Sequence, residues 1–352
     1  MKTGAPAPRT VVVHHRSGIG DLIWHIPYFR AVAATSRDGK VSVIARPSCC
    51  ATDILSAEPS IESVIEFDRR PRPAEHRRGR HDGWRAQWHF AADLRRQGFE
   101  RAVIFSGRMR YGVIAWLAGI RQRAGFGFTA GERMFLNQPP FIQPHRGPGN
   151  WVYPEATAFA IAQGFVAEPQ LPRLHVPQEL RQAMSARMQA LPRPLYALAI
   201  GASEARKRWP IAHFAELARG LAERGCGVVL LGGPAEADDA EAILRAVPAG
   251  LRDAVLALAE RSVLASAAAL AVSDFCIGND TGMLNVGAAV ECSCLGLFGA
   301  TRPLTHDPQL FAIEGDSMDL IEAGHVLARL ALLGAPGFTE SSMPTPQGEG
   351  LA

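Results

Sequence analysis

Short apolar runs alternate with longer stretches in which apolar residues recur at helical spacing, and this rhythm fills both halves of the 352-residue chain. Runs such as Val41–Ala45 are typical of buried strands in a parallel sheet, whereas the spacing in residues 22–34 predicts a helix that packs on such a sheet. The predicted strands are 11–15, 41–45, 64–67, 102–105, 195–200, 228–231, 275–277 and 295–298. Strands that alternate with helices predict an α/β protein with two Rossmann-like, doubly wound parallel sheets.

Proline and glycine mark the boundaries between the predicted domains. Residues 137–150 contain four prolines and two glycines, a composition typical of a domain edge. We therefore expect a first domain at 1–150, a linker with bridging helices at 151–194 and a second domain at 195–333. Residues 334–352, rich in Pro, Gly, Ser and Thr, are predicted to be a disordered tail.

Two glycine-rich turns, near opposite ends of the chain, each stand between a predicted strand and a predicted helix. The first spans residues 17–21 and ends in Asp21, and the second spans residues 278–282 and contains Asp280. Helix N-termini attract anions, and open α/β sheets bind ligands at the carboxyl ends of their strands. The pattern predicts two ligand-binding sheet edges facing each other across a cleft. Asp21 could act there as a general base or simply cap its helix, and the local pattern alone favours the cap.

Three further loops of the second half carry candidate chemistry. Lys207 lies in the loop between a predicted strand and a predicted helix. It could bind the oxygens of a phosphate, or it could be an ordinary basic residue of a surface loop. Glu236 follows a Gly-Gly-Pro turn and could accept hydrogen bonds from ribose or complement a helix dipole. Thr281 could bind a diphosphate at its helix start, and Thr301, after the next strand, could line the same pocket. No Walker P-loop occurs, and the first glycine turn lacks the G-x-G-x-x-G dinucleotide fingerprint.

The charge of the chain is unevenly distributed. Residues 1–150 hold 23 Lys and Arg against 12 Asp and Glu, whereas residues 151–352 hold 14 against 22. The basic half, with its arginine-rich segment 69–80, predicts an anionic partner or a solvated loop, and few stacking aromatics argue against nucleic acid. Without a D-x-D or a cluster at zinc spacing, we expect no metal and no cofactor. Without a signal peptide or a spanning apolar stretch, we expect a cytoplasmic protein whose basic face could touch the inner membrane surface.

Five short elements occur in an order that resembles the ADP-heptose:lipopolysaccharide heptosyltransferases, glycosyltransferase family 9. They are the G-D turn and apolar helix at 18–27, K-x-W-P at 207–210, G-G-P with an acidic residue at 232–236, N-D-T-G at 279–282 and F-G-x-T at 298–301. The resemblance spans roughly residues 10–330. Each element stands at a predicted strand end, so the five together are far more specific than any one of them.

The resemblance implies a GT-B architecture, in which the first Rossmann-like domain binds the acceptor and the second binds an ADP-sugar. Asp21 would be the general base for an inverting transfer of heptose to an anionic lipopolysaccharide-core sugar, without a metal. Lys207 would offset the charge on departing ADP. The expected donor-binding residues are Gly201, Ser203, Lys207, Glu236, Asp280, Thr281, Gly282 and Thr301. The expected acceptor-binding residues are Gly18, Gly20, Arg46 and Arg108.

Two other functions stay open. One is a GT-B transferase that uses another nucleotide sugar, because Asn285, Glu291 and Cys292 depart from the residues usual in the family near the expected donor site. The other is a catalytically silent nucleotide-binding scaffold, although such a protein would have no need to retain Asp21 and Lys207. A dinucleotide oxidoreductase is disfavoured by the missing fingerprint.

Overall fold

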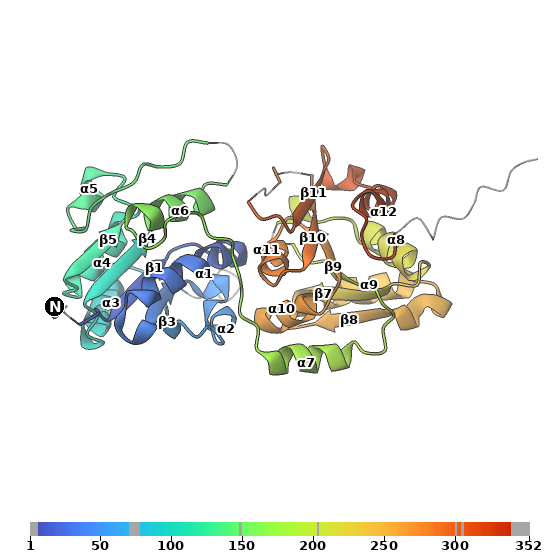
Figure 1. The fold of residues 1–352 in the computed structure, drawn as a ribbon, viewed down its shortest axis with the longest axis horizontal. Helices are drawn as coiled ribbons and strands as arrows, with labels where there is room; N and C mark the ends of the chain where they lie inside the picture. Colours follow the sequence, from blue (N-terminus) through green and yellow to red (C-terminus); the bar gives the residue numbers. More distant parts are fainter. Residues whose placement is uncertain are drawn as a thin grey trace, which may run out of the picture. The chain divides into compact units, whose positions relative to one another are not determined.

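The structure is a computed structural model that describes residues 6–69, 78–147, 150–202, 204–299, 301–303 and 306–338. The chain divides into two compact units, which meet in the sequence between His175 and Val176 (Figure 1). Each unit is built around its own parallel sheet with helices packed on it. The two doubly wound α/β units expected from the hydrophobic pattern are thereby confirmed.

The described residues of unit 1 form a five-stranded parallel sheet in the order β3-β2-β1-β4-β5. Its strands are β1 (Thr10–His14), β2 (Val41–Ala45), β3 (Ile61–Glu66), β4 (Arg101–Phe105) and β5 (Gln122–Gly125). Its helices are α1 (Ile19–Ala34), α2 (Ala51–Ile54), α3 (Trp84–Arg96), α4 (Met109–Leu117), α5 (Ala130–Arg133) and α6 (Val152–Ala162). The strand order reverses between β1 and β4, so the ends of these strands form the switch point where open sheets bind ligands.

Helix α1 carries the first glycine turn and is apolar on nearly every side. It packs on β1 and β2 and is also covered by α6. Because little of the helix is left in contact with solvent, it needs no polar face. Helices α3 and α4 pack against each other (Figure 1). The position of α1 fixes where Asp21, in its first turn, lies relative to the end of β1.

The described residues of unit 2 form a six-stranded parallel sheet in the order β11-β10-β9-β6-β7-β8. Its strands are β6 (Leu195–Ala199), β7 (Gly227–Gly232), β8 (Val255–Ala259), β9 (Phe275–Asn279), β10 (Ser293–Phe298) and β11 (Leu310–Glu314). Its helices are α7 (Gln178–Arg187), α8 (Ile211–Ala222), α9 (Ala237–Ala246), α10 (Val263–Ala271), α11 (Gly282–Ala289) and α12 (Ala323–Leu332). Here the order reverses between β6 and β9, which places the second glycine turn at the switch point.

The sequence did not predict three of the strands, and all three lie at sheet edges. They are β5, β8 and β11. An edge strand pairs on one side only and is partly exposed, so it does not need the continuous apolar run that marks a central strand. β5, with the sequence QRAG, shows this most clearly.

The expected linker and tail both contribute to the compact units. Within residues 151–194, α6 packs on α1 in unit 1 and α7 packs on α10 in unit 2. At the start of the expected tail, Ala335 is buried, and the Tyr196 hydroxyl donates a hydrogen bond to the Pro336 carbonyl at 2.5 Å. Residues 339–352 lie outside the described part of the chain.

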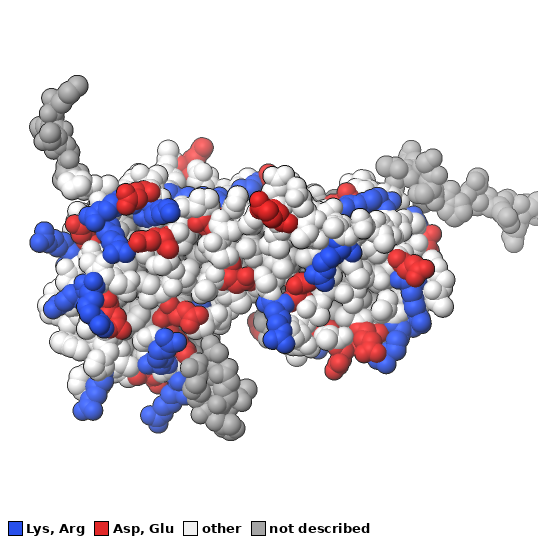
Figure 2. All heavy atoms as spheres, turned by 90° about the horizontal axis from the view of Figure 1, so that it is seen from below, with Lys and Arg blue, Asp and Glu red and all other residues white. Residues whose placement is uncertain are grey.

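Charged side chains of both signs lie beside one another on the face drawn in Figure 2. In unit 1 several ion pairs join residues near the amino ends of the strands. Arg9 contacts Glu62 at 2.8 Å, Arg37 contacts Glu100 at 2.7 Å and Arg30 contacts Glu58 at 2.6 Å. Much of the positive charge at that edge of the sheet is therefore already neutralised.

Candidate functional site

The turn between β1 and α1 holds Asp21 close to its own helix N-terminus. Asp21 is the third residue of α1, and its carboxylate accepts a hydrogen bond from the Gly18 N–H. The N-cap residue is Gly18, so Asp21 does not cap the helix as the sequence predicted; from the third helical position it forms the backward half of a capping box. A Cβ atom at Gly18 would lie 3.1 Å from Asp21 Oδ2, which explains the glycine there. Burial raises the pKa of Asp21, whereas the Arg16 guanidinium and the Gly18 N–H lower it.

Arg16, which the sequence analysis missed, connects Asp21 to helix α6. Its guanidinium lies 3.6 Å from the ring centroid of Trp151, at the start of α6. Burial lowers the pKa of Arg16, and the Asp21 and Glu155 carboxylates raise it. Glu155 is buried, and its Oε2 has no hydrogen-bond partner among the described residues. The Arg16 charge is thus shared between two carboxylates, and its place directly after β1 was the available sequence signal.

Arginines from three further strand ends converge on one tyrosine. Burial raises the pKa of Tyr111, and Arg46, Arg108 and Arg69 all lower it, with Arg46 also hydrogen-bonded to its side chain. Arg46 follows β2, Arg69 follows β3 and Arg108 follows β4. The structure therefore brings the two expected acceptor arginines to one edge and adds Arg69. Among the described residues, no carboxylate forms an ion pair with Arg46 or Arg108.

Three histidines lie buried beneath this edge and carry no charge at neutral pH. Burial lowers the pKa of His15 to about 3 and that of His25 to about 4, and it lowers the pKa of His14 well below its usual value. His25 Nδ1 contacts the Asp21 backbone oxygen at 2.6 Å, and the ring of His14 meets that of His25 edge-on. These histidines are core residues of unit 1.

In unit 2 the expected lysine and aspartate form an ion pair. Lys207 Nζ lies 2.7 Å from Asp280 Oδ2, and the Thr301 hydroxyl donates to the same oxygen at 2.6 Å. Lys207 and Asp280 are both largely buried, with 17% and 15% of their side chains exposed. The lysine charge is therefore held at the carboxyl ends of β9 and β10 by a carboxylate.

Asn279, at the end of β9, ties the loops around this pair together. Its side-chain oxygen accepts a hydrogen bond from the Trp209 N–H at 2.9 Å. Its amide nitrogen donates to the carbonyls of Ile200 at 2.9 Å and Gly201 at 3.1 Å. The sequence showed the N-D-T-G element, but only the structure shows that its asparagine positions the loop that carries Lys207.

The remaining expected donor residues lie at neighbouring strand ends. The Glu236 carboxylate accepts the Gly233 N–H at 2.8 Å, and a Cβ atom at Gly201 would come within 3.4 Å of it. Thr281 caps α11, which begins at Gly282, yet its buried hydroxyl has no hydrogen-bond partner among the described residues. The start of α11 therefore offers a hydroxyl and helix amides to an anion. Ser203 lies outside the described residues.

The described residues hold neither a metal-binding cluster nor a membrane-spanning helix. No three His, Cys, Asp or Glu side chains there are grouped so that they could hold a metal ion. Within the same residues, no helix has the length and apolar character needed to cross a membrane.

Comparison with known proteins places this site in a family. The family described as glycosyltransferase family 9 (heptosyltransferase) matches residues 87–310. The chain is 26% identical to lipopolysaccharide heptosyltransferase 2 of Salmonella typhimurium over 86% of this chain and 88% of that protein. The corresponding enzyme of Escherichia coli is 25% identical over the same shares.

Solved structures share the fold at low sequence identity. The structure of the E. coli ADP-heptose lipopolysaccharide heptosyltransferase II matches with a TM-score of 0.72 at 21% identity, over 92% of this chain and 98% of that one. A family 9 structure from Veillonella parvula matches with a TM-score of 0.75 at 16% identity, over 93% and 97%. Two such units in one chain give the GT-B architecture expected from the resemblance. Because the family match covers more than half of its residues, the chain belongs to glycosyltransferase family 9, the heptosyltransferases.

Proposed function

We propose that this enzyme transfers heptose from ADP-heptose to an anionic sugar of the lipopolysaccharide inner core, with inversion and without a metal. Unit 2 binds the donor and unit 1 binds the acceptor. Two relatives that match 86% of the chain are named lipopolysaccharide heptosyltransferases, which supports this choice of sugar and acceptor. The observation that carries the proposal is the Lys207–Asp280 pair beside Thr281, whose buried hydroxyl at the start of α11 has no hydrogen-bond partner among the described residues.

The donor diphosphate fits the end of β9 for electrostatic reasons. The start of α11 presents amides and the Thr281 hydroxyl, and Lys207, held by Asp280, adds an ammonium group. When ADP leaves, negative charge grows on its β-phosphate, and a lysine already fixed by Asp280 can stabilise it without reorganising. Glu236, at the end of β7, would accept hydrogen bonds from the ribose hydroxyls.

The acceptor fits the arginine-rich edge of unit 1. Four arginines follow the strands β1 to β4, namely Arg16, Arg46, Arg69 and Arg108. The carboxylate at this edge that would serve as the base is Asp21, in the turn between β1 and α1. Inner-core sugars bear carboxylates and phosphates, which guanidinium groups bind in bidentate fashion. Gly18 leaves room beside the Asp21 carboxylate for a sugar hydroxyl, because a Cβ atom there would lie 3.1 Å from Asp21 Oδ2.

The chemical step is a single displacement. Asp21 accepts the proton of the acceptor hydroxyl, whose oxygen attacks the anomeric carbon of the heptose. The bond between that carbon and the β-phosphate oxygen breaks, and ADP leaves with the electron pair. The proton on Asp21 then passes to solvent. Burial of Asp21 suits this role, because a raised pKa makes a carboxylate a stronger base.

Calorimetric titration of the full chain with ADP, UDP, GDP and ADP-heptose tests the donor assignment. We expect selective binding of ADP and ADP-heptose. The Lys207→Ala variant should bind ADP at least about tenfold more weakly, because a charge-assisted contact to phosphate is lost. Arg206→Ala is the matched control, since the neighbouring arginine is exposed and contacts Glu204.

The outcomes separate the remaining functions. Preference for UDP or GDP would keep a two-domain transferase but assign another donor. Binding of ADP-heptose without any transfer would favour the silent nucleotide-binding scaffold, and no binding of any nucleotide would contradict the proposed donor site. Equal ADP affinity in Lys207→Ala and the wild type would remove the lysine from the donor site.

A further inference from the structure

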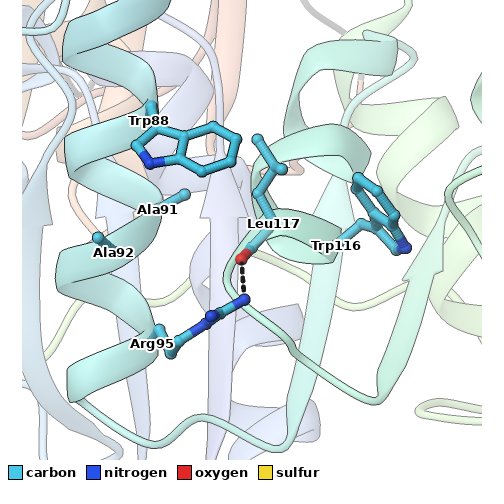
Figure 3. Close-up of a pocket in the computed structure, with 6 residues that line it drawn as sticks. All are labelled: Trp88, Ala91, Ala92, Arg95, Trp116 and Leu117. Carbon is cyan, nitrogen blue, oxygen red and sulfur yellow. Dashed lines mark hydrogen bonds between the residues drawn. The ribbon is translucent and has the colours of Figure 1, made fainter.

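A groove between helices α3 and α4 of unit 1 is lined by exposed tryptophans (Figure 3). It consists of two hollows of about 260 and 430 Å³ that share Trp88 and Leu117. Trp84 is 73% exposed, Trp88 56% and Trp116 53%. Single apolar residues on a surface need no explanation, but three tryptophans around one groove mark an interaction site.

The packing of unit 1 gives no reason for these tryptophans. On α3 the buried residues are Phe90, Ala91 and Leu94, and Trp84 and Trp88 follow one another on the exposed side at a spacing of one helical turn. On α4 the core side holds Tyr111 and Ile114, whereas Trp116 points outward and touches Phe135 edge-on.

The charged residues that line the groove are all basic. Arg95, Arg108 and Arg110 line it, and none of its described lining residues is acidic. The Arg85 guanidinium lies 5.3 Å from the ring centroid of Trp84. Arg95 donates a hydrogen bond to the Leu117 carbonyl at 2.8 Å, which holds its charge between the two helices (Figure 3).

We propose that the α3–α4 groove docks unit 1 onto the surface of an anionic lipid bilayer. Tryptophan is amphipathic and prefers the level of lipid headgroups, while each arginine near an anionic surface adds electrostatic attraction. Acidic residues at the rim would be expected for a basic protein partner, and the described lining has none. The groove also continues to Arg108, at the sheet edge proposed for the acceptor, so docking would bring that edge to the headgroups.

Co-sedimentation with lipid vesicles tests this inference without any nucleotide or glycan, so its result is independent of the proposed transfer. The full chain is mixed with vesicles of phosphatidylcholine alone or with phosphatidylglycerol added. We expect binding to the anionic vesicles that weakens as salt is raised, and at least about tenfold weaker binding to the neutral ones. Brominated acyl chains in the anionic vesicles should quench the tryptophan fluorescence.

Matched variants locate the surface. Trp84→Ser combined with Trp88→Ser should lower vesicle binding at least about tenfold and reduce the quenching, while transfer to a soluble, deacylated acceptor stays unchanged. Leu320→Ser combined with Leu332→Ser is the control, because these residues are exposed apolar positions of unit 2. Absence of binding by the wild-type chain, or binding that the tryptophan variant leaves intact, would overturn the proposal.

Discussion

At the scale of single residues, two opposing effects determine the pKa of Asp21. Its burial raises the pKa of the carboxylate, and Arg16 and the Gly18 N–H lower it. Capping and base catalysis need not exclude each other, since the N–H of Gly18 occupies only part of the carboxylate's capacity to accept hydrogen bonds. A single position can therefore fix the helix start and still accept a proton.

Replacing Asp21 tests its role as the base. Asp21→Asn should retain ADP affinity but lose transfer by about 10²-fold or more, because the amide cannot accept the proton.

A second variant tests the electrostatic setting of Asp21. In Arg16→Met, the pKa of Asp21 should rise, so the acidic limb of kcat/KM against pH should move to higher pH. Both assays are run in EDTA, since the proposed step uses no metal. Undiminished transfer by Asp21→Asn, or loss of wild-type transfer in EDTA, would contradict the mechanism.

At the scale of elements, one asparagine joins the end of β9 to both ends of the loop between β6 and α8 in unit 2. Asn279 is fully buried and bonds to the loop after β6 and to the residue that precedes the turn into α8. Trp209, also fully buried, donates its indole N–H to the Ile321 carbonyl at 2.6 Å. The loop that carries Lys207 is thus anchored on both sides.

Truncation of this asparagine should therefore affect both stability and donor binding. Asn279→Ala leaves the Trp209 N–H and two carbonyls without partners, so the free energy of unfolding should fall by about 2–3 kcal/mol. Urea unfolding measures this, and calorimetry should show weaker ADP binding because Lys207 loses its fixed position. Asn137→Ala removes an amide with two exposed hydrogen bonds and should cost much less. Equal losses in both variants would argue against the anchoring role.

At the scale of the whole molecule, the two halves of the chain differ in the sign of their net charge. The first 150 residues carry an excess of arginine, and at the amino ends of the unit 1 strands several arginines are paired with carboxylates. At the carboxyl ends, Arg46 and Arg108 form no ion pair among the described residues. Acceptor binding should therefore depend on electrostatic attraction.

Ionic strength should act on the acceptor through unit 1. With a soluble anionic acceptor, KM should rise several-fold between about 50 mM and 500 mM salt, since screening shortens the Debye length to a few ångströms. Arg46→Gln should raise KM at low salt and flatten this dependence. Arg96→Gln, which removes an exposed arginine that contacts Asp93, serves as the control. A KM that is insensitive to salt in the wild type would place the acceptor elsewhere.

The sequence by itself determined the central strands, most helices and the turns that carry Asp21 and Asp280. These features depend on local periodicity and on the burial of central strands on both faces, and both leave a direct trace in the order of residues. The five ordered elements were enough to indicate the family. The edge strands β5, β8 and β11 left no such trace, because they are short and partly exposed.

Only the tertiary structure decided which side chains meet. Arg16 is far in the sequence from Trp151 and Glu155 at the start of α6, and Lys207 is far from Asp280. The tryptophan groove likewise exists only because the crossing of β3 to β4 lays α3 beside α4. Such contacts depend on strand order and helix packing, and a sequence pattern records neither of them directly.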